Sequence, residues 1–252
     1  MNAPMTKTQI AIATHKSLFH NAKVKSVMDG MGKTENVIKK STNIKLGKIV
    51  KTGRLKGMPI YTVTLEERAT CSASCFHYST CYGNNMPFAT RYEANPALID
   101  LMAIELKALN KKHPNGFLVR LHILGDFYSV EYVNFWDKWL SQFDNLWVYG
   151  YSERQLGTKI GNALQALRTK WKTRFMVRIS GDTSQSHMSA LSFDDTDTQQ
   201  QVIDKKAFIC PTQIAKKGDT KSAPKGIETL VSDCGACGLC WTATKNVVFL
   251  TH

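Results

Sequence analysis

The sequence predicts an α/β protein whose parallel sheet forms a partial (β/α) barrel. From about residue 95 to residue 182, stretches with helical periodicity alternate with short apolar stretches rich in β-branched and aromatic residues. Strands that alternate with helices in this way are typical of βαβ units and hence of parallel sheets. All seven cysteines lie outside this alternating core, in two groups that predict metal-binding loops.

The domain organisation follows from composition along the chain. Residues 1–40 are polar and basic, which predicts an arm that is mobile or loosely docked. Residues 41–252 are expected to form a single α/β metal-binding domain. Within it, residues 45–65 hold two β-rich stretches around glycine-containing breakers, which predicts two strands. The first cysteine loop, residues 71–81, follows directly.

The βα core spans residues 95–182 and carries clear helix-start signals. Asn95 precedes Pro96, a typical cap and first helical residue, and Ser129 precedes a second helical stretch. The expected elements, in order, are a helix at 95–113, a strand at 116–124, a helix at 129–143, a strand at 145–152, a helix at 157–171 and a strand at 174–182.

Small and charged residues follow each predicted core strand. Gly125 and Asp126 follow the first strand, Glu153 and Arg154 the second, and Asp182 ends the third. A Gly-Asp pair after a strand is also ordinary turn and cap chemistry, so each position alone is ambiguous. Because parallel strands share their carboxyl edge, three such ends in succession predict a site there, with these charged side chains as its catalytic candidates.

Two residues of the first core strand are further candidates. Arg120 and His122 are two residues apart, so strand alternation predicts that both side chains lie on one face and line the pocket. For His122, a core or pocket role is a simpler interpretation than metal ligation, since the cysteines already supply enough ligands.

The C-terminal cysteine module, residues 207–241, contains the stretch CGACGLCW. Cys234, Cys237 and Cys240 have the C-x2-C-x2-C spacing of bacterial ferredoxins, in which a remote cysteine followed by proline completes cluster ligation. Cys210, followed by Pro211, is that remote residue here. The spacing favours a [4Fe–4S] cluster, and a structural zinc ion on the same four residues is the alternative.

The first cysteine group has three members, Cys71, Cys75 and Cys81, in the spacing C-x3-C-x5-C. Three thiolates leave one iron of a cubane cluster without a protein ligand, unless His77 inside the loop is the fourth. The sequence therefore predicts one or two [4Fe–4S] clusters.

A three-cysteine loop ahead of βα units resembles the architecture of radical S-adenosylmethionine enzymes, whose open iron holds the amino and carboxyl groups of that cofactor. The resemblance implies that Gly125 and Asp126 bind the cofactor amine, with Arg120 and His122 beside it. This sequence departs from the superfamily's usual C-x3-C-x2-C spacing, and its glycine-rich acidic motif is reduced to Gly-Asp.

A closer resemblance rests on four stretches in order: NIKLGKI (43–49), TCSASCFHYSTCY (70–82), RLHILGDFYSVEYVNFW (120–136) and CGACGLCW (234–241). Together they resemble the phage and plasmid gene product 88 domain family over roughly residues 40–241. The resemblance implies a mobile-element origin and a cluster-bearing protein, and it implies no particular reaction.

The charge balance predicts a second kind of partner. The formal net charge is +13, and residues 1–70 hold thirteen Lys or Arg against four Asp or Glu. Such a segment attracts nucleic acid through counterion release, although solvated lysines that keep the protein soluble explain it equally well. No motif for sequence-specific reading accompanies it. The sequence contains neither a membrane-length apolar run nor a secretion signal, so we expect a host-cell cytoplasmic protein.

Three functions remain open on these grounds. The first is a radical-SAM-like iron–sulfur enzyme with an open-site cluster, an auxiliary cluster, and a pocket lined by Asp126, Glu153, Arg154 and Asp182. The second is a non-catalytic nucleic-acid-binding protein of a mobile element, stapled by clusters or zinc. The third is an electron carrier. The substrate and the oligomeric state are not predicted.

Overall fold

The computed structural model describes residues 24–27, 36–75, 77–86, 88–181, 188–193, 207–214 and 233–250. Most of the predicted basic arm (1–23 and 28–35) and the candidate site residue Asp182 lie outside these described residues. Two parts of the arm are docked on the domain through strands β1 and β2. The strands are β1 (Val24–Lys25), β2 (Lys39–Lys40), β3 (Ile60–Thr62), β4 (Arg91–Tyr92), β5 (Phe117–Leu121), β6 (Leu146–Ser152), β7 (Phe175–Ser180), β8 (Ser189–Phe193), β9 (Ala207–Ile209) and β10 (Asn246–Leu250).

Eight of the described strands form one sheet in the order β2-β3-β5-β6-β7-β8-β10-β9. Every neighbouring pair in it is parallel except β2 with β3, so the predicted α/β fold with a large parallel sheet is confirmed. From β3 to β8 the strands follow one another across the sheet in chain order. A second, two-stranded sheet pairs β1 with β4. Because β3 to β8 point the same way, their carboxyl ends share one edge of the sheet.

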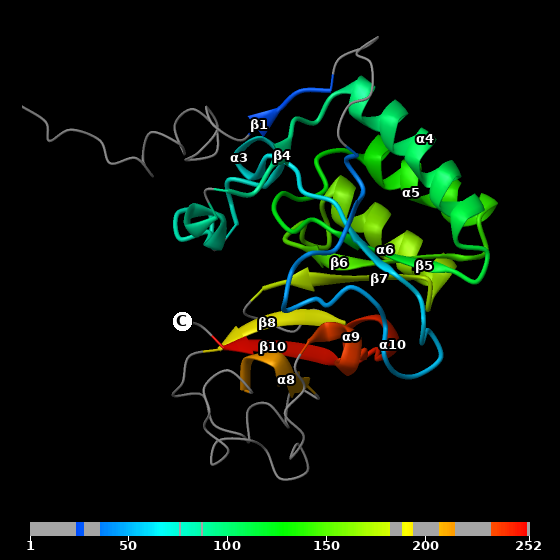
Figure 1. Cartoon of the computed structure of the whole chain (residues 1–252). Helices are drawn as coiled ribbons and strands as arrows, with labels where there is room; N and C mark the ends of the chain where they lie inside the picture. Colours follow the sequence, from blue (N-terminus) through cyan, green and yellow to red (C-terminus); the bar gives the residue numbers. More distant parts are fainter. Residues whose placement is uncertain are drawn as a thin grey trace, which may run out of the picture.

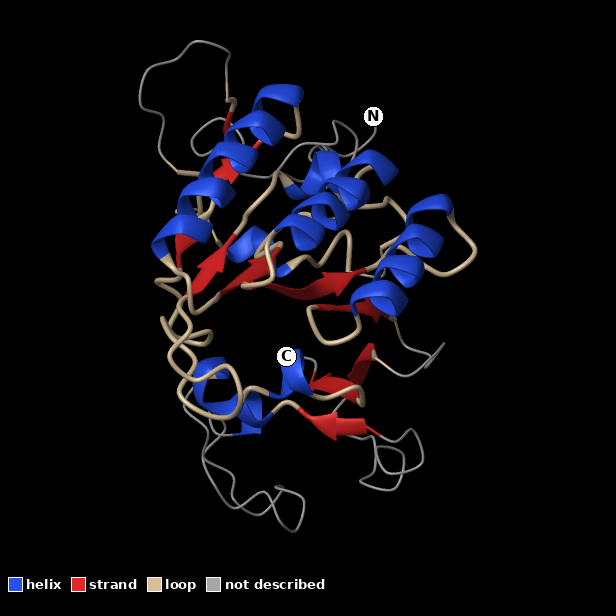
Figure 2. Ribbon diagram, turned by 90° about the vertical axis from the view of Figure 1, so that its right-hand side faces the viewer, coloured by secondary structure: helices blue, strands red, loops and turns tan. Residues whose placement is uncertain are grey.

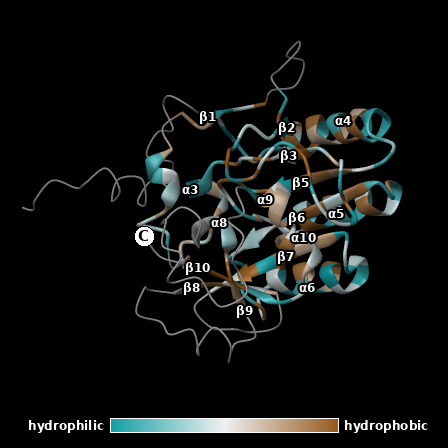
Figure 3. Cartoon of the chain, turned by 60° about the horizontal axis from the view of Figure 1, so that its bottom comes forward, coloured by the Kyte–Doolittle hydropathy of each residue, from teal (hydrophilic) through white to brown (hydrophobic). Residues whose placement is uncertain are grey.

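Three long helices cover one face of the sheet: α4 (Pro96–Lys112), α5 (Val130–Gln142) and α6 (Lys159–Trp171) (Figures 1 and 2). The predicted caps are present, since Asn95 Oδ1 accepts from the N–H of Leu98 at 2.8 Å and Ser129 Oγ accepts from that of Tyr132 at 3.1 Å. In Figure 3 the helices α4, α5 and α6 show both teal and brown turns, so each of them has polar and apolar residues. Among the described residues, no helix is long and apolar enough to cross a membrane.

The shorter helices surround the two cysteine groups. They are α3 (Glu67–Thr70), the 3-10 turn η1 (Tyr82–Asn85), α8 (Pro211–Ile214), α9 (Cys234–Cys237) and α10 (Leu239–Thr242). In Figures 1 and 2, α9 and α10 lie on the side of the sheet opposite the three long helices. The C-terminal cysteine segment is therefore a second covering layer of the same sheet.

Strand alternation separates the two layers chemically. Val119, Val148 and Val177 point to the helix side and belong to the main apolar core with Trp136. The opposite face, which we call the arginine–tyrosine face, carries Leu118 and Arg120 of β5, Tyr149 and Tyr151 of β6, and Met176 and Arg178 of β7. Trp241 of α10 packs on it against Tyr149, with ring centroids 4.9 Å apart. A face with two arginines needs a polar or charged layer above it.

The segment 45–65 forms less strand than its composition predicts. It contributes β3 and two isolated bridges, one antiparallel between Ile49 and Pro59 and one parallel between Leu65 and Tyr92. The reason is that its backbone pairs with a distant partner: Lys45 and Leu46 accept from Cys234 and Gly235, and Lys51 donates to Gly235. The backbone of Lys45, Leu46 and Lys51 thus holds the C-terminal cysteine loop in place.

Gly125 allows the end of β5 to pass close to the segment that leads into the first cysteine loop. Its φ is +88°, and a Cβ there would lie 2.7 Å from Leu65 Cβ and 2.8 Å from Thr70 Oγ1. Gly57 has a similar φ of +92°, but a Cβ there would meet nothing within 4 Å. The two glycines therefore share a backbone requirement and differ in the space around them.

We predict that Gly125→Ala lowers the free energy of unfolding by about 1–3 kcal/mol more than Gly57→Ala does, because only the first variant adds overpacking to backbone strain. Urea unfolding of both variants, followed by circular dichroism, measures the difference. Equal losses in the two variants would contradict the close approach at Gly125.

Candidate metal centres

Buried arginines hold the first cysteine loop. The Arg91 guanidinium pairs with the Glu67 carboxylate, with Nε 2.8 Å from Oε2, and also donates to the Gly83 carbonyl at 2.9 Å. Arg68, from the same short helix as Glu67, donates to the Tyr78 carbonyl and, at 2.8 Å, to Asn84 Oδ1. These bonds tie α3 to β4 and both of them to the residues between Cys75 and β4. Protein contacts thus fix the loop in place.

Cys71, Cys75 and Cys81 come together with two of the predicted carboxylates. None of the three is in a disulfide. Burial raises the pKa of all three thiols, to about 11 for Cys75. After burial, the negative charge of Asp126 is the next cause for Cys71, and Glu153 also raises the pKa of Cys75. Cys71 and Cys75 therefore lie near the residues that follow β5 and β6, and the charge of Cys81 acts on both of them.

His77 lies in this loop with an exposed side chain. Its Nδ1 is 3.4 Å from Thr80 Oγ1, and its backbone N–H bonds to Cys75, which lowers the pKa of that thiol. Ligation by the His77 imidazole stays the alternative to the predicted open iron.

Asp126 links three elements at the sheet edge. It is only 3 % exposed, and its carboxylate accepts from the N–H of Phe127 at 2.7 Å and from that of Glu153 at 2.9 Å. Its own N–H donates to Thr70 Oγ1 at 3.2 Å. Burial raises the Asp126 pKa to about 6 even though these hydrogen bonds oppose the rise. The Asp126 carboxyl thus joins the end of β5 to the end of β6 beside the first cysteine loop.

Arg154 and Gln155 continue this cross-linking. Arg154 donates from Nε to the Phe127 carbonyl at 2.7 Å and from Nη2 to the Thr70 carbonyl at 2.6 Å. Gln155 Nε2 donates to the carbonyl of Ser180, the last residue of β7, at 2.7 Å. The edge is therefore rigidly connected from the cysteine loop to β7. The Arg154 guanidinium therefore holds the strand ends in position.

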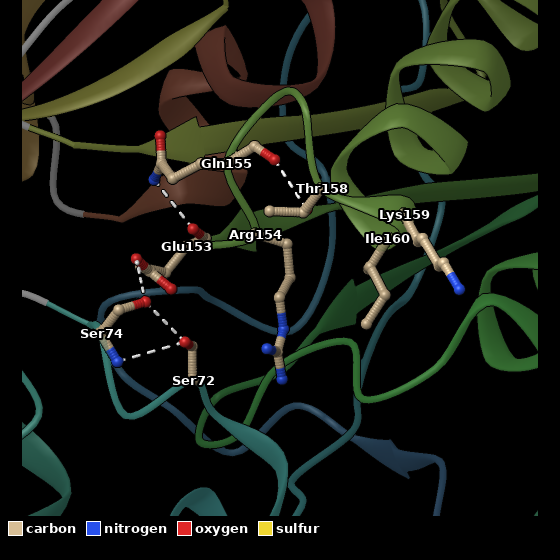
Figure 4. Close-up of a pocket in the computed structure, with 8 residues that line it drawn as sticks. All are labelled: Ser72, Ser74, Glu153, Arg154, Gln155, Thr158, Lys159 and Ile160. Carbon is tan, nitrogen blue, oxygen red and sulfur yellow. Dashed lines mark hydrogen bonds between the residues drawn. The ribbon is translucent and has the colours of Figure 1, made fainter.

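A cavity of about 210 Å³ lies between the cysteine loop and the start of α6. Figure 4 shows Ser74 facing Glu153, with Ser74 Oγ donating to Glu153 Oε1 at 3.4 Å. Of the predicted site residues, Glu153 and Arg154 line it. The sequence did not single out Ser72, Ser74 or Lys159, although the two serines lie between the cysteines in CSASC. The full lining is Ser72, Ser74, Glu153, Arg154, Gln155, Thr158, Lys159 and Ile160.

The expectation that Arg120 and His122 share a face is wrong. β5 ends at Leu121, and His122 has a left-handed backbone with φ 57°, so strand alternation does not extend to it. The His122 ring packs on the helix side against Phe127, with centroids 4.8 Å apart, and its Nε2 is 3.2 Å from Tyr132 Oη. Burial lowers the His122 pKa to about 3, so the ring is a neutral core histidine. Arg120 alone points to the arginine–tyrosine face.

The C-terminal cysteines Cys210, Cys234, Cys237 and Cys240 line one small cavity, closed on one side by Trp241. Local signals explain the shape of the loop. Asp233 caps α9 by accepting from the N–H of Ala236 at 2.9 Å. Gly238, with φ 70°, ends α9 and starts α10, which turns Cys240 back toward the other sulfurs.

Burial raises the pKa of the Cys237 thiol to about 11 and that of the Cys234 thiol further. For Cys234 the next causes are the charges of Cys240 and Cys210, so as thiolates these groups repel one another. Such a donor set favours a bound cation, which removes the protons and the repulsion together. In the described part of the chain, no group of three or more His, Cys, Asp or Glu side chains is already arranged to hold a metal ion.

Two buried cations act on the C-terminal cysteine segment. Arg178 is fully buried and donates to the Cys240 carbonyl at 2.5 Å and to the Ala243 carbonyl at 2.6 Å. Arg120 lies over the Tyr151 ring at 4.6 Å, and its charge lowers the pKa of Cys234. Among the described residues, neither arginine pairs with a carboxylate. Four thiolates on a metal or cluster would supply a negatively charged partner for these arginines. The residues present therefore fit such a group.

Comparison with protein families shows one match. A family model described as gene product 88 matches residues 36–243, which include both cysteine groups and the whole βα core. Comparison with curated proteins and with solved structures gave no match.

The raised pKa of Asp126 predicts a pH dependence of stability. Because its folded-state pKa of about 6 lies above its ordinary value of 3.8, the stability that this group contributes is present below about pH 4 and is lost as the pH rises through about 6. We predict that, relative to the wild type, metal-free Asp126→Asn gains about 2–3 kcal/mol of unfolding free energy between about pH 4 and pH 7.

Urea unfolding at a series of pH values measures this difference. Asp137→Asn is the control, since Asp137 forms a surface pair with Lys170 and should leave the wild-type pH profile in place. A parallel profile for Asp126→Asn and the wild type would show that the Asp126 carboxyl is not held in its neutral form by burial.

Proposed function

The chain belongs to the gene product 88 family, and we propose that it is an iron–sulfur protein of a mobile genetic element. One observation carries the proposal: Cys210, from one segment, and Cys234, Cys237 and Cys240, from another, line a single cavity. Buried Arg178 donates to the Cys240 carbonyl, and the charge of Arg120 lowers the pKa of Cys234. The ferredoxin-type spacing of these cysteines favours a [4Fe–4S] cluster over zinc.

The first cysteine group is proposed to hold a second cluster with one open iron. Cys71, Cys75 and Cys81 lie near Asp126 and Glu153 at the carboxyl edge of the parallel strands. In parallel sheets this edge is the usual place for a reactive site. The chain-order succession of strands from β3 to β8 is what a partial barrel with one such mouth requires.

The reaction class is proposed to be reductive cleavage of S-adenosylmethionine. When bound, an open-site cluster supplies an electron and a coordination position for the amino and carboxyl groups of this cofactor. The chain's own residues would bind the rest of the molecule in the adjoining cavity, where Glu153 offers a carboxylate, Ser72 a hydroxyl and Lys159 an ammonium group. Asp126 and Arg154 would keep the strand ends in register around it.

A non-catalytic nucleic-acid-binding protein is the second candidate, and one observation favours it. The segment that holds the C-terminal cysteine loop exposes five cations to solvent, with Lys51 also paired to Asp233. Backbone-directed binding through such a segment weakens steeply with salt. The five are Lys45, Lys48, Lys51, Arg54 and Lys56.

We predict that the anaerobically purified protein carries about eight iron and eight acid-labile sulfide per chain, as two cubane clusters require. Cys234→Ser should retain about half of each, because it removes a ligand of one cluster only. Iron and sulfide assays measure both values. Ala236→Ser, in the same short helix, is the matched control and should retain the full content. Two zinc ions per chain without sulfide would reject the iron–sulfur proposal.

We further predict that adding S-adenosylmethionine to the reduced protein changes the EPR spectrum of the open-site cluster and yields 5′-deoxyadenosine. Cys75→Ser should abolish both effects, since it disrupts the open-site cluster and leaves the four-cysteine centre in place. An unchanged spectrum without 5′-deoxyadenosine, in protein that carries both clusters, would reject the enzyme and favour the non-catalytic candidate.

A further inference from the structure

We infer that Tyr151 is a positioning residue that raises the reduction potential of the centre held by the four C-terminal cysteines. The inference rests on the proposed function, because it requires that centre to be an iron–sulfur cluster. It deepens the proposal in two ways. The four-cysteine centre becomes redox-active, and named side chains set its reduction potential.

The Tyr151 hydroxyl donates a hydrogen bond to a cysteine sulfur. Its Oη lies 3.0 Å from Cys240 Sγ. β6, which carries Tyr151, lies between β5 and β7 inside the sheet, and Phe249 packs edge-on against the Tyr151 ring at 5.3 Å. The phenol is therefore fixed by the sheet and its neighbours and does not depend on bound metal for its direction.

A hydrogen bond to a ligand sulfur withdraws negative charge from a cluster. Reduction adds an electron, so the bond stabilises the reduced state more than the oxidised state and raises the potential. Cys240 is also the residue whose carbonyl accepts from buried Arg178 at 2.5 Å. The same cysteine thus meets a donor at its sulfur and a cation at its backbone, and both favour additional negative charge.

Arg120 adds a second cation above the same phenol. Its guanidinium carbon lies 4.6 Å from the centre of the Tyr151 ring, and it also donates to the carbonyls of Leu121 and His122 at the carboxyl end of β5. The Arg120 side chain therefore reaches from the four-cysteine centre to the strand edge that carries Asp126. In a low-dielectric layer this positive charge acts on the centre with little screening.

The same strand supplies a matched control for Tyr151. Tyr149 is two residues earlier on the same face, and its ring packs on Trp241 at 4.9 Å. Its buried hydroxyl has no hydrogen-bond partner among the described residues. Tyr149→Phe and Tyr151→Phe therefore make the same chemical change at neighbouring positions, and only the second removes a bond to a ligand.

The test is a redox titration of full-length, anaerobically prepared protein in a Cys75→Ser background, so that only the four-cysteine centre contributes to the visible and EPR signals. We expect Tyr151→Phe to lower the midpoint potential and Tyr149→Phe to leave it unchanged, with equal iron content in both. A second pair serves if Tyr151→Phe loads poorly: Arg120→Gln should lower the potential, and Arg120→Lys should retain most of the wild-type value.

Equal potentials in the wild type and both tyrosine variants, in protein that holds its iron, would overturn the inference and leave the iron–sulfur proposal intact. An equal shift in the two variants would overturn it too, because a general packing effect would then explain the change. Zinc at the four-cysteine centre would overturn the inference alone. Absence of iron from the whole wild-type protein would reject both the inference and the proposed function.

Discussion

Buried positive charge on one face of the sheet is the constraint on which the rest of the structure depends. Arg120 of β5 and Arg178 of β7 lie on this face on either side of β6; Arg120 contacts two carbonyls and the Tyr151 ring, and Arg178 donates to carbonyls. A buried ion without compensation costs several kcal/mol, and carbonyl contacts recover part of that. Under the proposal, four metal-bound thiolates of the C-terminal segment would supply the remaining compensation. The same segment also packs Trp241 on the apolar part of this face.

The two cysteine groups are fixed by different parts of the same framework. The first loop depends on the buried Arg91–Glu67 pair and on the cross-links that Asp126 makes at the carboxyl edge. The second depends on segment 45–51 and on Arg178. Each centre is thus anchored to the central strands from its own side, one at the edge and one on the face.

The sequence predicted what local chemistry decides. Helices α4 and α5 begin where Asn95 and Ser129 supply caps, and the parallel sheet followed from the alternation of elements. It failed where distant contacts decide. His122 leaves the strand pattern because β5 ends one residue earlier, and the 45–51 stretch gives its hydrogen bonds to Cys234 and Gly235. The cavity beside Glu153 joins two loops, so no spacing in the sequence indicates it.

The central claim is that two separate cysteine groups hold iron on one parallel sheet. Anomalous diffraction at the iron edge, from crystals grown anaerobically, tests it most directly. The account predicts two peaks, one in the cavity lined by Cys210, Cys234, Cys237 and Cys240 and one beside Cys71, Cys75 and Cys81. A map without iron in the cavity of the four C-terminal cysteines would contradict it. So would a map with zinc in that cavity and no iron at either cysteine group.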